Sequence, residues 1–277
     1  MIRIAIRCRP ELAERVLADL VELAPGGVEE ERGNGYVEYA IYGAPGELPA
    51  LPNLRAVAGE GLVEVTSAEV PDNWADRWRD FHKPMLIGDR LWVRPSWEAP
   101  REGTIDLVVD PGQAFGTGAH PTTRMCLELL LELAESQPTR GRLADWGTGS
   151  GVLAIAAAKL GFGPIVACDH EPAALEAAAS NAGANGVELE LVRINLRAEP
   201  PPVAPTAVAN LTAPILRELA QRVDPAPELL ICSGLLAAEG DSLRDAFRRH
   251  GLVERERRTE GEWVAVSLHE GPSGVPA

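Results

Sequence analysis

The chain has 277 residues, of which 45% are hydrophobic and 24% charged, a composition typical of a globular protein with room for two modest domains. No apolar run reaches the roughly 20 residues that cross a bilayer, and residues 1–10 lack the apolar block of a secretion signal, so a secreted or membrane-spanning protein is not expected. The 41 acidic and 26 basic residues give a formal net charge of −15, which disfavours binding to bare nucleic acid and favours a basic protein or a cationic small molecule as partner.

The first part of the chain predicts a small α+β domain. The expected elements, in chain order, are a strand over 2–8, a helix over 11–23, a hairpin of strands 28–31 and 36–42, a helix over 47–57 and a strand over 62–68. This order of strands and helices is that of a ferredoxin-like sandwich. We therefore expect a ferredoxin-like α+β domain over residues 1–68.

A linker helix is predicted between two domains. Trp74, Trp78 and Phe81 follow the spacing i, i+4 and i+7, which places them on one face of a helix over 73–83. This face favours a helix docked between domains, and a partner-binding surface is the alternative. The expected limits are a linker over 69–83, a second domain over 84–269 and a flexible tail over 270–277.

The second domain begins with a predicted hairpin over 84–97 and then alternates strands with helices. The expected strands are 107–109, 143–145, 165–169, 189–195, 207–210, 228–232 and 263–268, and the expected helices are 122–134, 151–160, 172–185, 214–223 and 238–250. This alternation predicts a doubly wound α/β fold with a mostly parallel sheet.

Four cysteines, Cys8, Cys126, Cys168 and Cys232, are scattered along the chain. None forms a C-x-x-C pair, and each lies in an apolar or regular stretch. The spacing predicts buried thiols of a cytoplasmic protein rather than disulfides or metal ligands, and no metal site is expected.

The strongest local signal for a ligand is the run DWGTGSG, which starts at Asp145 and follows a predicted strand. Gly147 and Gly149 allow a tight turn and close approach of a ligand to the backbone, and the next helix offers its N-terminus. The dinucleotide fingerprint G-x-G-x-x-G is not matched, because residue 152 is valine. Asp145 suits a ligand that carries a positive charge. A glycine-rich turn without a ligand is the alternative.

Polar residues end two later strands. Asp169 could accept hydrogen bonds from both hydroxyls of a ribose, or it could cap the following helix. Asn210 offers an acceptor and two donors without charge, which suits the orientation of an amine substrate, and capping the helix before Pro214 is the alternative.

A long loop over 110–123, DPGQAFGTGAHPTT, precedes the helix that leads to the glycine run. It holds three glycines, two prolines, an aromatic residue and a histidine, and long loops of this kind are often functional. Taken alone, His120 would more often be structural, and Thr122 or Thr123 could cap the helix. The combination favours a lid over a ligand.

These segments, together with VANLTAP, SGLL and GEWV, resemble the PrmA family, which methylates the large-subunit ribosomal protein L11 with S-adenosylmethionine. The resemblance covers nearly the whole chain; FGTGxHPTT is specific to the family, whereas many methyltransferases share the glycine run. It implies a Rossmann-like methyltransferase domain preceded by a small domain that holds the ribosomal protein. Trp146 departs from the family, which usually has a small or aliphatic residue there, and the proline-rich loop 199–205 is also atypical.

The resemblance also implies site residues and a function. The cofactor contacts fall on Thr123, Gly147, Asp169 and Asn210, with Phe115, Asp145 and Gly149 lining the same pocket. Asn210 would also position the substrate amine. The implied reaction transfers methyl groups from S-adenosyl-L-methionine to Lys side chains or the N-terminal α-amine of ribosomal protein L11. The implied enzyme is a cytoplasmic monomer that contacts no membrane and no nucleic acid directly.

Three alternatives stay open. The chain could methylate another protein or a small amine, or it could be a catalytically silent module that binds S-adenosylmethionine. A dehydrogenase is disfavoured by the missing third glycine. No residue is an obvious general base, since either His120 or water could take the proton.

Overall fold

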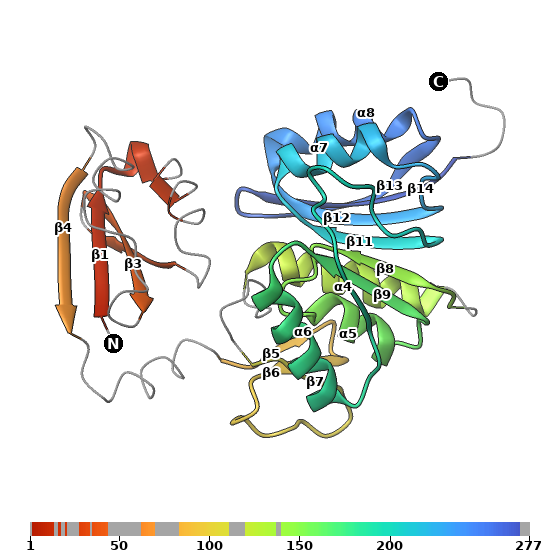
Figure 1. Cartoon of the computed structure of the whole chain (residues 1–277), viewed down its shortest axis with the longest axis horizontal. Coiled ribbons are helices and arrows are strands. Elements are labelled where there is room, and N and C mark those ends of the chain that lie inside the picture. Colours follow the sequence, from red (N-terminus) through yellow and green to blue (C-terminus); the bar gives the residue numbers. More distant parts are fainter. Residues whose placement is uncertain are drawn as a thin grey trace. The chain divides into compact units, whose positions relative to one another are not determined.

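The computed structural model describes residues 2–13, 16–17, 20, 28–33, 35–43, 62–69, 83–110, 120–136 and 140–271. Described residues up to 69 belong to one compact unit, and those from 83 onward belong to a second (Figure 1). The helix predicted over 47–57, nearly all of the linker 69–83 and most of the tail 270–277 lie outside the described residues. The domain limits expected from the sequence therefore stay predictions.

The N-terminal unit contains a four-stranded antiparallel sheet in the order β2-β3-β1-β4. Its strands are β1 (Ile2–Cys8), β2 (Glu29–Gly33), β3 (Tyr36–Gly43) and β4 (Leu62–Glu69). β1 lies between β3 and β4, as the split βαβ arrangement requires. Of the helix predicted over 11–23, Pro10–Leu12 form a 3-10 turn, and Val16 and Leu20 are helical and buried in the core. The ferredoxin-like assignment stays a prediction, because the second helix is not among the described residues.

The second unit is built on a seven-stranded sheet in the order β10-β9-β8-β11-β12-β14-β13. Its strands are β8 (Leu143–Trp146), β9 (Ile165–Asp169), β10 (Glu190–Arg193), β11 (Thr206–Asn210), β12 (Leu229–Leu236), β13 (Leu252–Glu260) and β14 (Trp263–Glu270). The five strands from β10 to β12 are parallel, whereas β14 and β13 are antiparallel. The predicted doubly wound fold with a mostly parallel sheet is confirmed.

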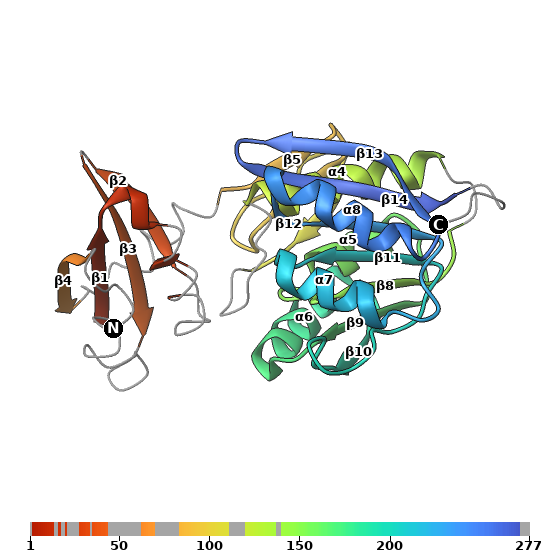
Figure 2. The same cartoon turned by 90° about the horizontal axis from the view of Figure 1, so that it is seen from above.

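Helices cover both faces of this sheet (Figure 2). They are α4 (Pro121–Ser136), α5 (Val152–Lys159), α6 (Pro172–Asn185), α7 (Ala213–Arg222) and α8 (Gly240–Arg248), with a 3-10 turn over Ala237–Glu239. α4 and α5 share one core with Leu143, and α7 and α8 share the other with Ala144. Because both faces are buried, the central strands are largely apolar apart from Asp145 of β8, which explains why the sequence predicted them well.

A separate three-stranded sheet contains β5 (Met85–Ile87), β6 (Leu91–Arg94) and β7 (Ile105–Val108). The predicted hairpin of β5 and β6 is confirmed. The strand expected over 107–109 was assigned to the alternating α/β pattern, and that assignment is wrong: Leu107 pairs with Val93 of β6 instead. A short apolar run does not specify which strand it will pair with.

The sequence missed β13, which is the edge strand of the sheet and, among the described strands, pairs with β14 alone. Its sequence LVERERRTE is highly charged, and most of its side chains remain at least partly exposed. β12 also continues four residues beyond its predicted end, through the SGLL segment to Leu236. All four cysteines are buried and unpaired, as predicted, and burial raises the pKa of the Cys168 thiol to about 12. No helix among the described residues is long and apolar enough to cross a membrane.

Candidate functional site

The strand order of the large sheet reverses between β8 and β11. In doubly wound sheets, ligands bind in the crevice outside the carboxyl ends of the strands at this point. Asp145 lies one residue before the end of β8, and Asp169 and Asn210 are the last residues of β9 and β11. The topology therefore brings three residues predicted from separate motifs to one edge of the sheet.

The glycine run forms a turn that other residues could not make without strain. Gly147, Gly149 and Gly151 have φ values of 77°, 54° and 84°, in the left-handed region that favours glycine. The amides of Gly147 and Thr148 both donate to the Cys168 carbonyl at 2.9 Å, which fixes the turn against the end of β9. A Cβ atom on Gly147 would lie 2.3 Å from Cδ2 of Leu211. The turn is thus both rigid and closely packed.

Asp145 is fully buried beneath this turn. Its Oδ2 accepts hydrogen bonds from the Thr148 hydroxyl at 2.7 Å and from the Ala154 amide at 3.1 Å. Its Oδ1 is also buried and has no hydrogen-bond partner in the described structure. Burial raises the pKa of Asp145 to about 7, and the bond from Thr148 opposes that rise. An unpaired buried acceptor of this kind is costly unless a ligand or a proton satisfies it.

Two backbone amides fix the carboxylate of Asp169. The Gly149 amide donates to its Oδ2 at 3.0 Å, and the Glu171 amide donates to its Oδ1 at 3.1 Å. The N-cap of α6 is Glu171, so the alternative in which Asp169 caps this helix is wrong. The side chain is 12% exposed. Each carboxylate oxygen accepts one of these bonds and has lone-pair capacity for another.

Asn210 is held by Thr123, which lies 87 residues earlier in the chain. The side-chain amide of Asn210 donates to the Thr123 hydroxyl at 3.0 Å. Thr123 is fully buried in the first turn of α4. This bond directs Nδ2 toward α4 and turns Oδ1, the acceptor, away from it. Thr212 is the N-cap of α7, so the alternative in which Asn210 caps that helix is wrong.

The backbone after Asn210 rests on β12. The Leu211 amide donates to the Ser233 carbonyl at 3.0 Å, at an irregularity in the pairing of β12 with β14. Gly234 has a φ of 87°, and a Cβ atom there would lie 2.3 Å from the Leu211 carbonyl oxygen. The sequence analysis noted the SGLL segment, residues 233–236, as part of the family resemblance but predicted no structural role for it. A glycine inside an apolar strand is the signal that points to such a close backbone approach.

Two asparagines of α6 support the site, and sequence reasoning missed both. Asn181 donates to the Ser150 carbonyl at 2.9 Å and accepts from the Asp110 amide at 3.1 Å. Asn185 makes the same kind of double contact with the backbone of Val108. They join α6 to the glycine turn and to the chain that leads into the predicted lid. Their signal is two asparagines spaced i, i+4 in an alanine-rich helix.

Two of the departures from the PrmA pattern, Trp146 and the proline-rich loop 199–205, contact each other. Trp146 is buried, and its indole nitrogen donates to the Pro202 carbonyl at 3.1 Å. The proline-rich loop therefore provides the acceptor that the larger side chain requires.

The loop over 110–123 is described only at its ends, and Phe115 lies outside the described residues. Thr122 and Thr123 do not cap α4, because the helix already begins at Pro121. The imidazole of His120 lies against Trp263, with ring centroids 4.9 Å apart and an interplanar angle of 72°. The described HPTT end of the FGTGxHPTT motif thus contacts the GEWV motif through His120 and Trp263.

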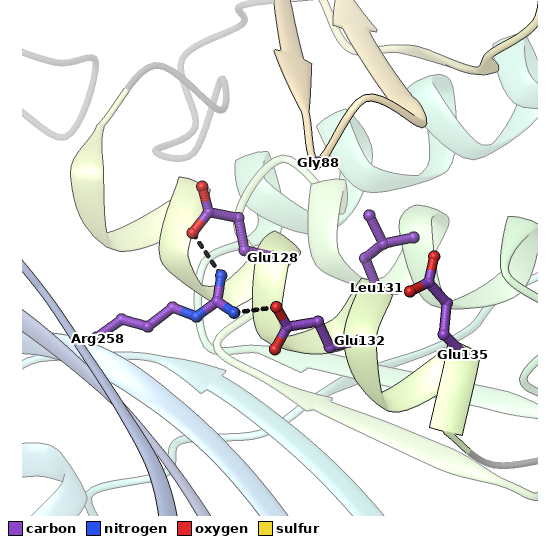
Figure 3. Close-up of a pocket in the computed structure, with 6 residues that line it drawn as sticks. All are labelled: Gly88, Glu128, Leu131, Glu132, Glu135 and Arg258. Atoms are coloured by element: carbon purple, nitrogen blue, oxygen red, sulfur yellow. Dashed lines mark hydrogen bonds and ion pairs between the residues drawn. The ribbon is translucent and has the colours of Figure 1, made fainter.

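A second polar cluster surrounds a hollow of about 300 Å³ between α4, β13 and the β5–β6 turn (Figure 3). Its lining residues are Gly88, Glu128, Leu131, Glu132, Glu135 and Arg258. Arg258 points between Glu128 and Glu132 and forms an ion pair with each (Figure 3). Glu135 pairs with Arg90 at 2.7 Å. Because arginines neutralise these glutamates, the hollow is a structural ion-pair cluster.

Comparisons with known proteins agree with the motifs. Residues 51–270 match the family model described as ribosomal protein L11 methyltransferase (PrmA). The chain is 37% identical to the ribosomal protein L11 methyltransferase of Symbiobacterium thermophilum, covering 90% of this chain and 84% of the relative. The corresponding protein of Pelotomaculum thermopropionicum is 35% identical, with 96% and 97% covered.

A solved structure, the ribosomal protein L11 methylase of Lactobacillus delbrueckii subsp. bulgaricus, superposes with a TM-score of 0.61 at 27% identity. The match covers 69% of this chain and 100% of that chain. The family model spans well over half of this chain, and both curated relatives exceed 30% identity over most of it. The chain therefore belongs to the PrmA family of ribosomal protein L11 methyltransferases, and it is an enzyme of the protein methyltransferase class.

Proposed function

We propose that this chain transfers methyl groups from S-adenosyl-L-methionine to amines of ribosomal protein L11, on Lys side chains, the N-terminal α-amine or both. The observation that carries the proposal is the meeting of Asp145, Asp169 and Asn210 at the switch point of the sheet in a chain of this family. We propose further that the enzyme acts as a cytoplasmic monomer.

The residues present fit the cofactor. The unpaired Oδ1 of Asp145 suits a group with positive charge, and S-adenosylmethionine carries a sulfonium and an ammonium. The carboxylate of Asp169, held by two amides, suits the paired hydroxyls of a ribose. The turn at Gly147 and Gly149 lets a ligand approach the backbone. When bound, the cofactor supplies a methyl group already activated by the sulfonium charge.

The protein mainly contributes alignment. Asn210 is fixed by Thr123, so its Oδ1 can accept an N–H of the substrate amine and hold the nitrogen lone pair in line for attack. Asn210 has no charge and takes no proton. The amine must therefore arrive neutral, which costs less for an α-amine, with a pKa of about 8, than for a Lys amine, with a pKa of about 10.4. Desolvation in the site lowers either value.

The charge balance supports a basic protein substrate. A net charge of −15 attracts a cationic partner at long range, and added salt weakens that attraction. We propose that the N-terminal unit binds the ribosomal protein. Its strand β2 carries three consecutive glutamates, Glu29–Glu31, and the last two are exposed.

The test is methyl transfer from labelled S-adenosylmethionine to purified ribosomal protein L11, followed by intact-mass analysis. Mass increments of whole methyl groups are expected, and they should form much more slowly in Asn210→Ala. Cofactor binding by calorimetry without transfer to this protein would redirect the search to another protein or a small amine. Binding without transfer to any amine would indicate a silent module, and a preference for a nicotinamide dinucleotide would indicate a dehydrogenase.

A further inference from the structure

His120 supplies hydrogen-bond acceptors to the first turn of α4. Pro121 occupies the first helical position and has no N–H to satisfy. The amides of Thr123 and Arg124 both donate to the His120 carbonyl at 3.1 Å. The Thr122 amide donates to Nδ1 of the His120 ring at 3.4 Å. This is the geometry of an N-cap, in which the side chain accepts from the second helical N–H, although histidine is not a common capping residue.

Nδ1 of the His120 ring has a second contact within Thr122. This nitrogen is also 2.8 Å from the Thr122 hydroxyl. A cap through Nδ1 requires the tautomer whose hydrogen lies on Nε2, in which Nδ1 accepts from the Thr122 amide and the Thr122 hydroxyl. Burial lowers the pKa of His120, which keeps the imidazole neutral and able to accept. The edge-to-face contact with Trp263 holds the plane of the ring.

The cap leads directly to the proposed site. Thr123 follows the capped amide by one residue, and its hydroxyl accepts the bond that orients Asn210. We propose that His120 is a positioning residue, which caps α4 through Nδ1, is braced by Trp263, and thereby sets Thr123 and the direction of the Asn210 carbonyl. This inference rests on the proposed function for Asn210.

The test compares two losses of the cap with one replacement. His120→Ala removes the ring acceptor, and His120→Gln has a longer amide that caps poorly, which covers the case that the alanine variant does not fold. His120→Asn restores a short neutral acceptor, the residue type that caps best. The matched control is Glu260→Gln. This change removes the ion pair between Glu260 of β13 and Arg124, which lies in the first turn of α4, and it leaves the cap residue in place.

Two measurements on the ligand-free protein do not depend on activity. Losing a cap worth about 1 kcal/mol should speed hydrogen exchange of the amides of residues 122–124 by about fivefold in His120→Ala. The side-chain NH₂ resonance of Asn210, assigned with Asn210→Ala, should shift in His120→Ala and return in His120→Asn. Glu260→Gln should leave that resonance in place. An unmoved Asn210 resonance in His120→Ala would overturn the proposal, even if exchange at α4 became faster.

The third measurement is methyl transfer. His120→Ala should lower kcat by about tenfold, the change that roughly 1.4 kcal/mol of lost alignment would cause, and His120→Asn should recover most of it. In an Asn210→Ala background, His120→Ala should cause no further loss, because its effect passes through Asn210. Independent, additive losses would overturn the inference. If the wild-type enzyme transfers no methyl group, the proposed function fails, and the Asn210 resonance still decides whether His120 sets this side chain.

Discussion

Two acidic clusters of the same unit differ in how their charges are satisfied. In the hollow between α4 and β13, Glu128 lies 2.6 Å from Arg258 and Glu135 lies 2.7 Å from Arg90. At the carboxyl edge of the sheet, neither Asp145 nor Asp169 has an arginine or lysine partner among the described residues. Backbone amides and one hydroxyl hold these two carboxylates instead, and the exposed imidazole of His170 lies with its Nδ1 3.3 Å from Asp169 Oδ1. The first arrangement pairs each carboxylate with an arginine, whereas the second holds two carboxyl groups with no arginine or lysine beside them among the described residues, as the proposed cofactor site requires.

The acidic side chains of the two clusters also differ in their exposure to solvent. The side chains of Glu132 and Glu135 are 50% and 49% exposed, whereas Asp145 is fully buried and Asp169 is 12% exposed. Exposed ion pairs contribute little free energy because water and salt screen them. A carboxylate held in a buried, rigid turn interacts strongly with any charge placed beside it. Burial and the absence of a cationic partner among the described residues therefore distinguish the candidate site from the hollow better than the number of acidic residues does.

The largest effect is expected where the backbone behind Asn210 is most closely packed. Gly234→Ala would place a Cβ atom 2.3 Å from the Leu211 carbonyl oxygen, at a residue with a φ of 87°. Overpacking and left-handed strain together should cost about 3–5 kcal/mol of unfolding free energy and abolish methyl transfer. Gly251→Ala is the matched control, since its φ is 78° and nothing lies within 4 Å. It should cost only about 1–2 kcal/mol in urea denaturation. Equal losses would show that Leu211 is not closely confined.

The second effect is a pH dependence that comes from Asp145. Its pKa is raised from 3.8 to about 7 in the folded protein, so the folded state binds more protons than the unfolded state between these values. Stability contributed by this group is therefore full at low pH and falls as pH rises toward 7. Through this group the wild type should lose about 3 kcal/mol of unfolding free energy between pH 5 and pH 8, and Asp145→Asn, which has no carboxyl group to titrate, should not. Urea denaturation at the two pH values measures the change, and a pH-independent difference would exclude a neutral buried Asp145.

The third effect concerns the proposed ribose contact. Asp169→Ala should weaken binding of S-adenosylmethionine by about 1–3 kcal/mol, because hydrogen bonds to a charged acceptor are lost. Glu171→Gln, which removes a charge two residues away, should leave the affinity within about twofold, since an exposed charge is screened. Calorimetry gives both values. Unchanged affinity in Asp169→Ala would reject the assignment of this residue to the cofactor.

The residues at the site were predictable in part because local patterns place them. α6 has its predicted limits, since Pro172 at the start and Gly186, with a φ of 65° at the C-cap, are strong boundary signals. The parallel strands were found because burial on both faces makes them apolar. Their carboxyl ends then supplied Asp145, Asp169 and Asn210.

The remaining features depend on contacts that sequence spacing does not contain. The bond between Thr123 and Asn210 joins residues 87 positions apart. The missing partner of Asp145 Oδ1 follows from burial in three dimensions. β13 escaped prediction because an edge strand with alternating charges has the pattern of a surface segment. Local propensity therefore identified the framework, whereas the polar contacts that orient the site required the folded chain.

The smallest effect is expected in the ion-pair hollow. Arg258→Met keeps most of the aliphatic stem but removes the charge shared by Glu128, Glu132 and Glu256. Because these glutamates are substantially exposed, the loss in unfolding free energy should be no more than about 1 kcal/mol, and it should shrink further in high salt. Binding of S-adenosylmethionine should not change in calorimetry. A large loss of affinity in this variant would show that the hollow belongs to the ligand site, and the contrast between the two acidic clusters would then fail.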